Sequence, residues 1–179
     1  ERIRLIGIGD RETVETTEKP YDLVEIRRLG GGGYRGGTRS DYLLTRQGLE
    51  ACLNALSEKG VLSLTFTIRN PPRTVPRMLR LLKAAGDELG LPIGKNLLIS
   101  RGWNTASFLY LKGGLSEEEL TTARDFWESR SFDPIYFPGM EAEEANRRNL
   151  FPEPYFYRVA RRSLEGDRVQ SDYFDLSVP

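Results

Sequence analysis

The most constraining feature of this chain is a helix and a strand that follow each other directly between Thr45 and Ile68. The first half repeats apolar side chains at the i, i+3, i+4, i+7 spacing of one helical face, at Leu49, Cys52, Leu53 and Leu56. Gly60 follows, where a glycine can end a helix in the left-handed conformation. The next residues alternate as a strand does, with one face made of Leu62, Leu64, Phe66 and Ile68. The segment predicts an amphipathic helix, a stop at Gly60 and a strand.

A separate strand is predicted at Tyr21 to Ile26, so strand, helix and strand form a β-α-β unit. The usual product of this unit is a parallel sheet covered by helices. The other predicted elements are a strand at 1–9, a helix opening at Thr74 with Pro76 and ending at Gly90, an antiparallel hairpin of 96–100 and 105–112, a helix from Ser116, a strand at 132–137 and a polar helix at 141–149. The tail beyond Phe151 is aromatic and interrupted by proline. We expect an α/β layered domain with an antiparallel edge hairpin.

The helix from Ser116 has unusually complete start signals. Glu119 completes a capping box with Ser116, and Leu115 can pack on Leu120 as a hydrophobic staple. The predicted inner face continues with Ala123, Phe126 and Trp127. The glutamates at 117–119 could be taken for a metal cluster, but the dipole of a first helical turn is a sufficient reason for them. We therefore expect no metal site.

Composition excludes several kinds of chemistry. Lys and Arg together number 26, as do Asp and Glu, so the net charge of zero disfavours a nucleic-acid surface. No histidine is present, which removes every Ser-His or Cys-His arrangement and the commonest zinc ligand. The lone cysteine, Cys52, fits a core residue in a reducing compartment. No apolar run is long enough for a membrane span, so we expect a soluble, cytoplasmic chain.

Arg27 to Ser40 holds six glycines and has no periodicity, which predicts a crossover loop. Residues 31–36 satisfy the G-x-G-x-x-G pattern, so a dinucleotide site is one alternative, and an Arg-Gly-Gly nucleic-acid element is another. The reading we favour is a lid, because ligands of such sheets bind at the carboxyl ends of parallel strands. On that hypothesis the candidates to touch a substrate are Tyr34, Arg35, Asp41 and Tyr42, although for each residue taken alone a plain loop position is the favoured interpretation.

Several runs in order resemble the spermidine synthase-like proteins: G-D-R at 9–11, Y-D-L-V at 21–24, Y-L-L-T at 42–45, G-V-L-S-L-T at 60–65 and S-D-Y-F-D-L-S-V-P at 171–179. The resemblance implies the Rossmann-like fold of S-adenosylmethionine-dependent methyltransferases, of which this chain would be the C-terminal portion. It divides the chain into a partial Rossmann-like domain at 1–139 and a C-terminal helix and aromatic tail at 140–179. A parent protein would supply the first two strands, the glycine-rich turn and, in bacterial relatives, a membrane region.

The resemblance also assigns residues. Asp10 matches the acidic side chain that accepts a hydrogen bond from the adenine amino group, with Arg11 beside it, although Asp10 could also be a solvated strand end. Arg27 and Arg28 stand where true aminopropyltransferases carry carboxylates that deprotonate the amine. Arginine cannot act as a base and repels a polyamine cation, which argues against spermidine synthesis. An anionic substrate is the natural inference.

The resemblance implies S-adenosylmethionine or its decarboxylated form as cofactor in the parent, and a small-molecule ligand. By itself, the chain is expected to lack the cofactor turn and to show no methyl or aminopropyl transfer. The competing hypothesis is a non-catalytic interaction or regulatory domain that keeps the fold. The predicted strand at 1–9 lacks its family neighbours, which raises the further expectation of a homodimer.

Overall fold

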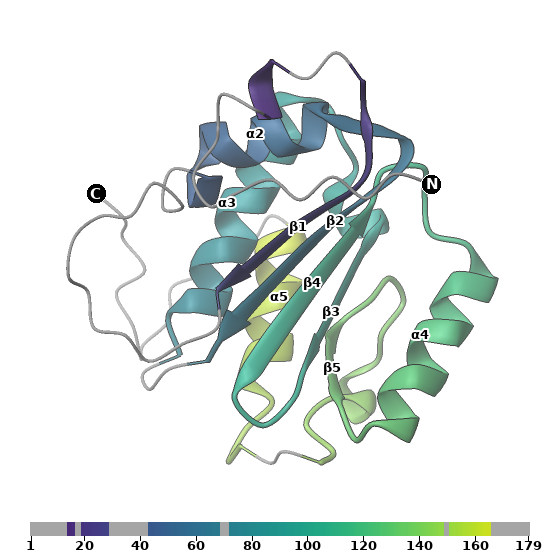
Figure 1. Cartoon of the computed structure of the whole chain (residues 1–179). Helices are drawn as coiled ribbons and strands as arrows, with labels where there is room; N and C mark the ends of the chain where they lie inside the picture. Colours follow the sequence, from purple (N-terminus) through teal and green to yellow (C-terminus); the bar gives the residue numbers. More distant parts are fainter. Residues whose placement is uncertain (1–13, 17–18, 29–42, 69–71, 149–150, 166–179) are drawn as a thin grey trace.

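Five strands form one mixed sheet in the computed structural model, which describes residues 14–16, 19–28, 43–68, 72–148 and 151–165 (Figure 1). In chain order the strands are β1 (Tyr21–Arg28), β2 (Leu56–Thr67), β3 (Leu97–Arg101), β4 (Thr105–Leu111) and β5 (Asp133–Tyr136). The helices are α2 (Arg46–Asn54), α3 (Thr74–Glu88), α4 (Glu117–Ser129) and α5 (Tyr155–Glu165), with single 3-10 turns at Ile93–Lys95 and Ala142–Glu144. The predicted strand at 1–9 lies outside the described residues.

The sheet has the order β1-β2-β4-β3-β5. β1 and β2 are parallel, and β4 is antiparallel to both of its neighbours, β2 and β3. β3 therefore runs in the same direction as β1 and β2, and β5 is antiparallel to β3. This topology confirms the predicted parallel β-α-β unit and the antiparallel pairing of the hairpin, and it makes the chain an α/β protein. The predicted position of the hairpin at the edge is wrong, because β5 pairs with β3 and the outer strands of the described sheet are β1 and β5.

The helix in the segment from Thr45 to Ile68 ends earlier than predicted. The Thr45 side chain caps α2 by accepting a hydrogen bond from the Gly48 N–H. Leu49, Cys52 and Leu53 of the predicted apolar face are fully buried in α2, whereas Leu56 is buried as the first residue of β2. The helix stops at Asn54, however, so the assignment of Gly60 as its end is wrong. Gly60 lies inside β2, where a Cβ atom would stand 2.7 Å from the carbonyl oxygen of Tyr21. Close approach of β1, and not helix termination, is what requires glycine there.

Backbone carbonyl groups at the end of α2 and the start of β2 accept hydrogen bonds from Lys112, the residue that follows β4. The Lys112 Nζ donates to the carbonyl oxygens of Leu53 and Leu56, at 3.1 and 2.8 Å. A cation at a helix C-terminus is also favoured by the helix dipole. This side chain therefore connects α2, β2 and β4 at one corner of the sheet.

The main core lies between one face of the sheet and α2, α3 and α5, which stand behind the sheet in Figure 1. Its strand residues alternate, as in Leu62, Leu64 and Phe66 of β2, and Phe66 meets Phe108 of β4 edge to face. From α3 it receives Val75, Met78, Leu79 and Leu82, as the helical spacing predicts. Gly90 ends this helix region with φ +67°, which confirms its predicted role.

A second, smaller cluster lies on the opposite face, under α4. It contains Trp127 with Leu98, Phe137, Met140 and Tyr157, and Leu115 and Leu120 pack against it. The capping box of Ser116 and Glu119 is present, so the predicted start of this helix is confirmed. Phe126 is 51% exposed, however, and its prediction as an inner-face residue is wrong. It instead contacts Phe132 at the edge of the cluster.

The C-terminal third differs most from the prediction. The prediction of a polar helix at 141–149 is wrong. Ala142–Glu144 forms one 3-10 turn, and the next four residues are bends. The tail beyond Phe151 contains α5, which the sequence analysis missed. Phe156 and Ala160 of α5 belong to the main core, and the helix packs on α3 and β5. Its apolar residues follow helical spacing from Phe156 to Leu164, a signal that the aromatic and proline-rich start obscures.

Candidate functional site

The carboxyl ends of β1 and β2 form the candidate functional edge. Arg27 and Arg28 are the last two residues of β1, paired with Thr65 and Phe66 of β2. The sequence predicts that the strand ends at Ile26, but both arginines lie inside it. The turn between β3 and β4 reaches the same edge, because the Ile68 N–H donates to the Asn104 carbonyl oxygen at 2.6 Å. Trp103 in that turn is 87% exposed.

Arg27 projects from the sheet face opposite the main core. Val24 and Ile26 pack toward that core, so the intervening Glu25 and Arg27 point the other way. The Arg27 Nε donates to Glu25 Oε1 at 2.7 Å, and the two side chains are 63% and 36% exposed. An exposed pair of this kind contributes only about 0–1 kcal/mol, so a ligand can displace it at small cost.

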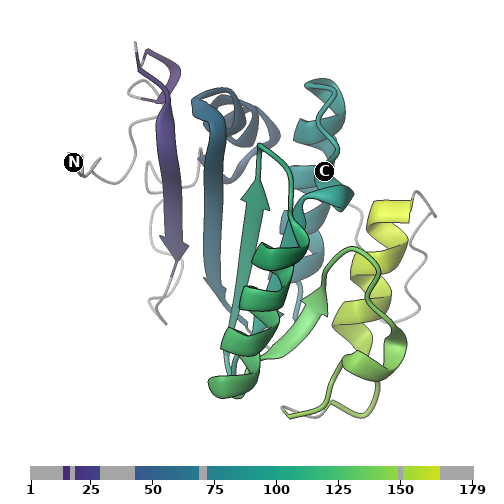
Figure 2. The ribbon, with the colours of Figure 1, turned by 90° about the vertical axis from the view of Figure 1, so that its right-hand side faces the viewer.

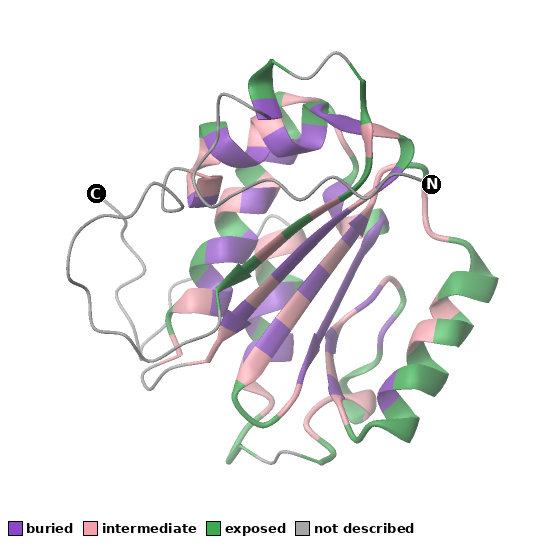
Figure 3. Cartoon of the chain, in the orientation of Figure 1, coloured by how far each residue is buried: buried purple, intermediate pink, exposed green. Residues whose placement is uncertain are grey.

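Hydroxyl side chains continue this face across the neighbouring strands. Strand pairing puts Arg27 beside Thr65, Thr65 beside Ser107, and Ser107 beside Ser100. The Thr65 and Ser107 hydroxyl oxygens lie 3.1 Å apart and share a hydrogen bond. Figure 3 shows this face toward the viewer, with exposed and half-buried residues along β1, β2 and β4. We name the row of Arg27, Thr65, Ser107 and Ser100 the polar row.

The polar row offers hydrogen-bond donors and acceptors together with one cation. Hydroxyl groups can bind polar atoms of either kind, and a guanidinium binds carboxylate or phosphate oxygens. The row contains no carboxylate except the paired Glu25 next to it. Its chemistry therefore suits binding of a polar, anionic group and offers no base for activating an amine.

Most of the predicted site residues lie outside the described part of the chain. Asp10 and Arg11, the expected adenine contacts, belong to this group, as do the loop candidates Tyr34, Arg35, Asp41 and Tyr42 and the glycine pattern at 31–36. Arg27 and Arg28 are placed next to each other in β1, and by strand alternation they point to opposite faces. The predicted grouping of Asp10 with Arg27 around one cleft stays a prediction.

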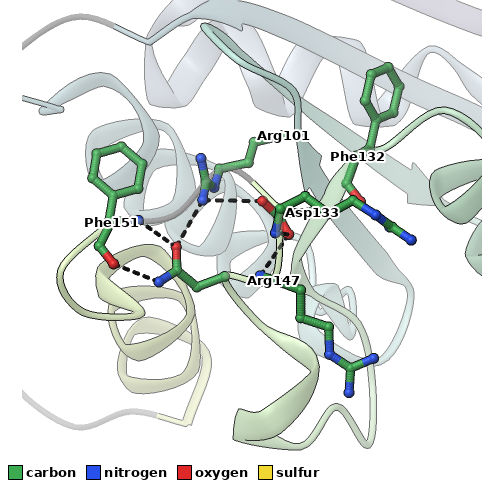
Figure 4. Close-up of polar contacts among 7 residues, drawn as sticks. Arg101, Phe132, Asp133, Arg147 and Phe151 are labelled. Carbon is green, nitrogen blue, oxygen red and sulfur yellow. Dashed lines mark hydrogen bonds and ion pairs between the residues drawn. The ribbon is translucent and has the colours of Figure 1, made fainter.

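A buried ionic cluster that the sequence did not predict lies where β3 ends and β5 begins (Figure 4). Arg101 and Asp133 are 3% and 0% exposed, and Arg101 Nη2 lies 3.3 Å from Asp133 Oδ2. The same guanidinium nitrogen donates to Asn146 Oδ1 at 3.0 Å, and its carbon lies 4.6 Å from the centre of the Phe151 ring. Burial lowers the pKa of Arg101, and the charge of Asp133 opposes that shift.

The partners of this cluster show that it is structural. Asp133 Oδ1 accepts the backbone N–H groups of Arg147 and Arg148, at 2.9 and 2.8 Å. Asn146, at φ +55°, donates from its amide to the Phe151 carbonyl oxygen and accepts from the Phe151 N–H. These contacts tie residues that follow β5 to the ends of β3 and β5. The sequence signal for this cluster was the presence of Arg101 and Asp133 in strand segments that are otherwise largely apolar.

Within the described segments, the remaining reactive groups do not form a site. Burial raises the pKa of the Cys52 thiol to about 12, which leaves it protonated and unreactive at neutral pH. Across the described residues, no three His, Cys, Asp or Glu side chains are grouped so that they could hold a metal ion. Glu119 binds Ser116, and the Glu117 and Glu118 carbonyl oxygens accept from Thr121 and Thr122. In the described segments no helix has the length and apolarity needed to cross a membrane.

Comparisons with family models, with curated proteins and with solved structures found no match to this chain.

Proposed function

We propose that this chain is the C-terminal part of a spermidine synthase-like, S-adenosylmethionine-dependent transferase domain that has lost aminopropyl transfer. The sheet supports this proposal. β1, β2 and β3 share one direction, and β4 is inserted between β2 and β3 in the opposite direction. The resemblance expects such a parallel set of strands with an antiparallel hairpin at its edge. β5 pairs with β3 beyond this set of strands, so the hairpin is internal in the described sheet, and in this respect the sheet differs from the expectation.

The observation that carries the functional part is the position of Arg27 and Arg28 at the carboxyl end of β1. Ligands of open α/β sheets bind outside these strand ends. Aminopropyl transfer needs a carboxylate there to accept a proton from the attacking amine. A guanidinium keeps its proton at any accessible pH and repels the ammonium groups of putrescine.

The same residues favour an anionic ligand. Arg27 exchanges Glu25 for a ligand carboxylate or phosphate at small cost, because the pair is exposed. Thr65 and Ser107 of the polar row add hydroxyl donors beside it. We therefore propose that the substrate bound at this edge carries a carboxylate or phosphate group. The cofactor contacts expected at Asp10 and Arg11 lie outside the described residues, so the nucleoside part stays a prediction.

The test is calorimetric titration of the chain with AMP, methylthioadenosine, S-adenosylmethionine and putrescine, together with an assay for spermidine formation from putrescine and decarboxylated S-adenosylmethionine. We expect AMP to bind and putrescine neither to bind nor to react. Arg27→Ala should weaken AMP binding about tenfold, corresponding to loss of one charge-assisted contact. Arg162→Ala, an exposed arginine of α5, is the matched control and should leave binding unchanged. Spermidine formation would refute the proposal.

A second candidate is an interaction or regulatory domain without a small-molecule ligand. It is favoured by the ion pair of Arg27 with Glu25, which satisfies the guanidinium without any ligand. The titrations distinguish the two candidates. Absence of heat with every nucleoside and anion, in a protein shown to be folded, would support the interaction domain.

A further inference from the structure

β1 is at the margin of the described sheet. It pairs with β2 along one side, and no described strand pairs with its other side (Figure 2). An edge strand of this kind presents backbone N–H and C=O groups that can pair with another strand. Proteins usually protect such edges with proline, a bulge, charged side chains or a very short strand. β1 is eight residues long and contains no proline; its register with β2 shifts between Tyr21 and Leu23 and is regular from Leu23 to Arg28, and its charged side chains can pair with a strand of complementary charge.

The side chains on the outer face of this edge are accessible. Leu23 is 58% exposed, and the Arg27 and Glu25 side chains are 63% and 36% exposed. Val24 and Ile26, on the inner face, pack against the main core. The edge therefore has one face fixed by the core and another with charged groups that an approaching strand can contact.

The charges of β1 are ordered along its length. Asp22 and Glu25 precede Arg27 and Arg28, so the first part is acidic and the end is basic. When two copies of such a strand pair in antiparallel fashion, Glu25 of one copy can lie opposite Arg27 of the other, whereas in that register Arg28 lies opposite Val24 and Asp22 faces neither arginine. Opposite charges directly across a strand pair are stabilising, and like charges are destabilising.

The choice of register follows from these charges. A two-fold axis at Glu25 would put that residue opposite itself, and an axis at Arg27 would do the same with two arginines. An axis at Ile26 places Glu25 opposite the partner's Arg27 and Arg27 opposite the partner's Glu25. A two-fold interface forms each contact twice, so this register gives two attractive pairs and sets Ile26 against Ile26.

We propose that two copies of this chain associate through antiparallel pairing of their β1 strands, with the two-fold axis at Ile26. The two sheets then continue into one, and the Arg27 and Glu25 pair of each copy becomes part of a group of four alternating charges. The interaction uses the strand edge and its charge order and does not require the transferase function, although it involves the same Arg27 and Glu25 side chains as the proposed anion site.

Reversal of the charges tests the register. The full chain is examined by sedimentation equilibrium over a wide concentration range, as wild type, Glu25→Arg, Arg27→Glu and the double reversal. Each single reversal replaces two attractive pairs by two repulsive ones, so we expect the dimer dissociation constant to rise about tenfold or more. The double reversal restores both pairs and should restore the wild-type constant. Glu58→Arg makes the same change in net charge as Glu25→Arg at another exposed position and should have no effect.

Circular dichroism melts of each variant establish that it is folded. Hydrogen exchange on the wild-type chain gives a second measurement, because the β1 amide groups should exchange more slowly as the concentration rises. A wild type that is monomeric throughout, or a dimer that the single reversals leave intact, would overturn the proposal. So would a double reversal that stays monomeric while folded.

Discussion

Two arginine–carboxylate pairs in this chain have similar chemistry but opposite surroundings. Arg27 and Glu25 are exposed, so water and salt screen their attraction and the pair contributes little to stability. Arg101 and Asp133 are buried, and removing either one would leave the other charge without compensation in the interior. The exposed pair is therefore available to a ligand or a partner, whereas the buried pair fixes the structure.

At this scale, Asp133→Ala should lower the free energy of unfolding by about 3–5 kcal/mol, because it leaves Arg101 buried without its counter-charge. It also removes the acceptor for the N–H groups of Arg147 and Arg148. Urea denaturation followed by circular dichroism measures the change. Adding Arg101→Met should recover part of the loss, since the buried charge is then absent.

The matched control is an exposed pair. Lys83 Nζ lies 2.6 Å from Asp87 Oδ2 on α3, and the side chains are 29% and 58% exposed. Asp87→Ala should change the free energy of unfolding by less than about 1 kcal/mol. Equal losses from Asp133→Ala and Asp87→Ala would show that burial does not decide the role of these pairs.

Among the elements, those with regular apolar spacing could be predicted from the sequence. β2 and α3 each bury one face in the main core, so apolar residues alternate along β2 and recur at helical spacing along α3. The end of α2 could not be predicted, because Gly60 suggested a helix end. The structure shows that glycine is needed there for the close approach of the Tyr21 carbonyl oxygen of another strand. α5 has helical apolar spacing as well, but it was missed because the aromatic and proline-rich residues before it obscure that spacing. Its Phe156 and Ala160 belong to the main core.

The candidate site was predictable only in part for a related reason. The sequence indicates that Arg27 and Arg28 follow the core of a parallel strand, and the structure places them at a carboxyl edge. The polar row depends on strand order, which brings Ser107 of β4 beside Thr65 of β2. No local spacing encodes that order. Tertiary pairing, and not propensity, assembles the row.

For α4, the capping box gives an element-scale prediction with a pH dependence. Glu119 Oε2 accepts from the Ser116 N–H and hydroxyl, at 2.8 and 2.7 Å, and these bonds lower the pKa of Glu119. Ser116→Ala should lower the free energy of unfolding by about 1 kcal/mol at neutral pH. One part of this stabilisation, the Glu119 N–H bond to the Ser116 hydroxyl, does not depend on pH. The other part is the hydroxyl bond to the Glu119 carboxylate; because the folded pKa is lowered, this part is present above the unfolded pKa of about 4.3 and is lost as the pH falls through the folded value.

Thermal unfolding of wild type and Ser116→Ala at a series of pH values measures this dependence. The difference between the two proteins should shrink as the pH falls below about 4. Thr122→Ala is the control in the same helix, because its hydroxyl donates to a carbonyl of α4 and takes no part in the cap. A pH-independent difference for Ser116→Ala would count against the role of the Glu119 carboxylate.

For the whole molecule, the two apolar clusters share β3, whose alternate residues point to opposite faces. Leu97 and Ile99 belong to the main core, and Leu98 between them belongs to the cluster under α4. Loss of either cluster therefore removes support from the same strand. We expect the two clusters to unfold together in one cooperative transition, as small single domains usually do.

The two tryptophans allow this expectation to be tested. Trp127 is 5% exposed in the cluster under α4, whereas Trp103 is 87% exposed, so in Trp103→Phe the fluorescence reports that cluster alone. Far-ultraviolet circular dichroism reports mainly the helices of the larger core. The urea midpoints of the two signals should coincide, and Leu98→Ala should shift both by the same amount, with a loss of about 2–5 kcal/mol. An earlier fluorescence transition would show instead that α4 separates from a sheet that remains folded, since β3 would then keep its structure through Leu97 and Ile99 alone.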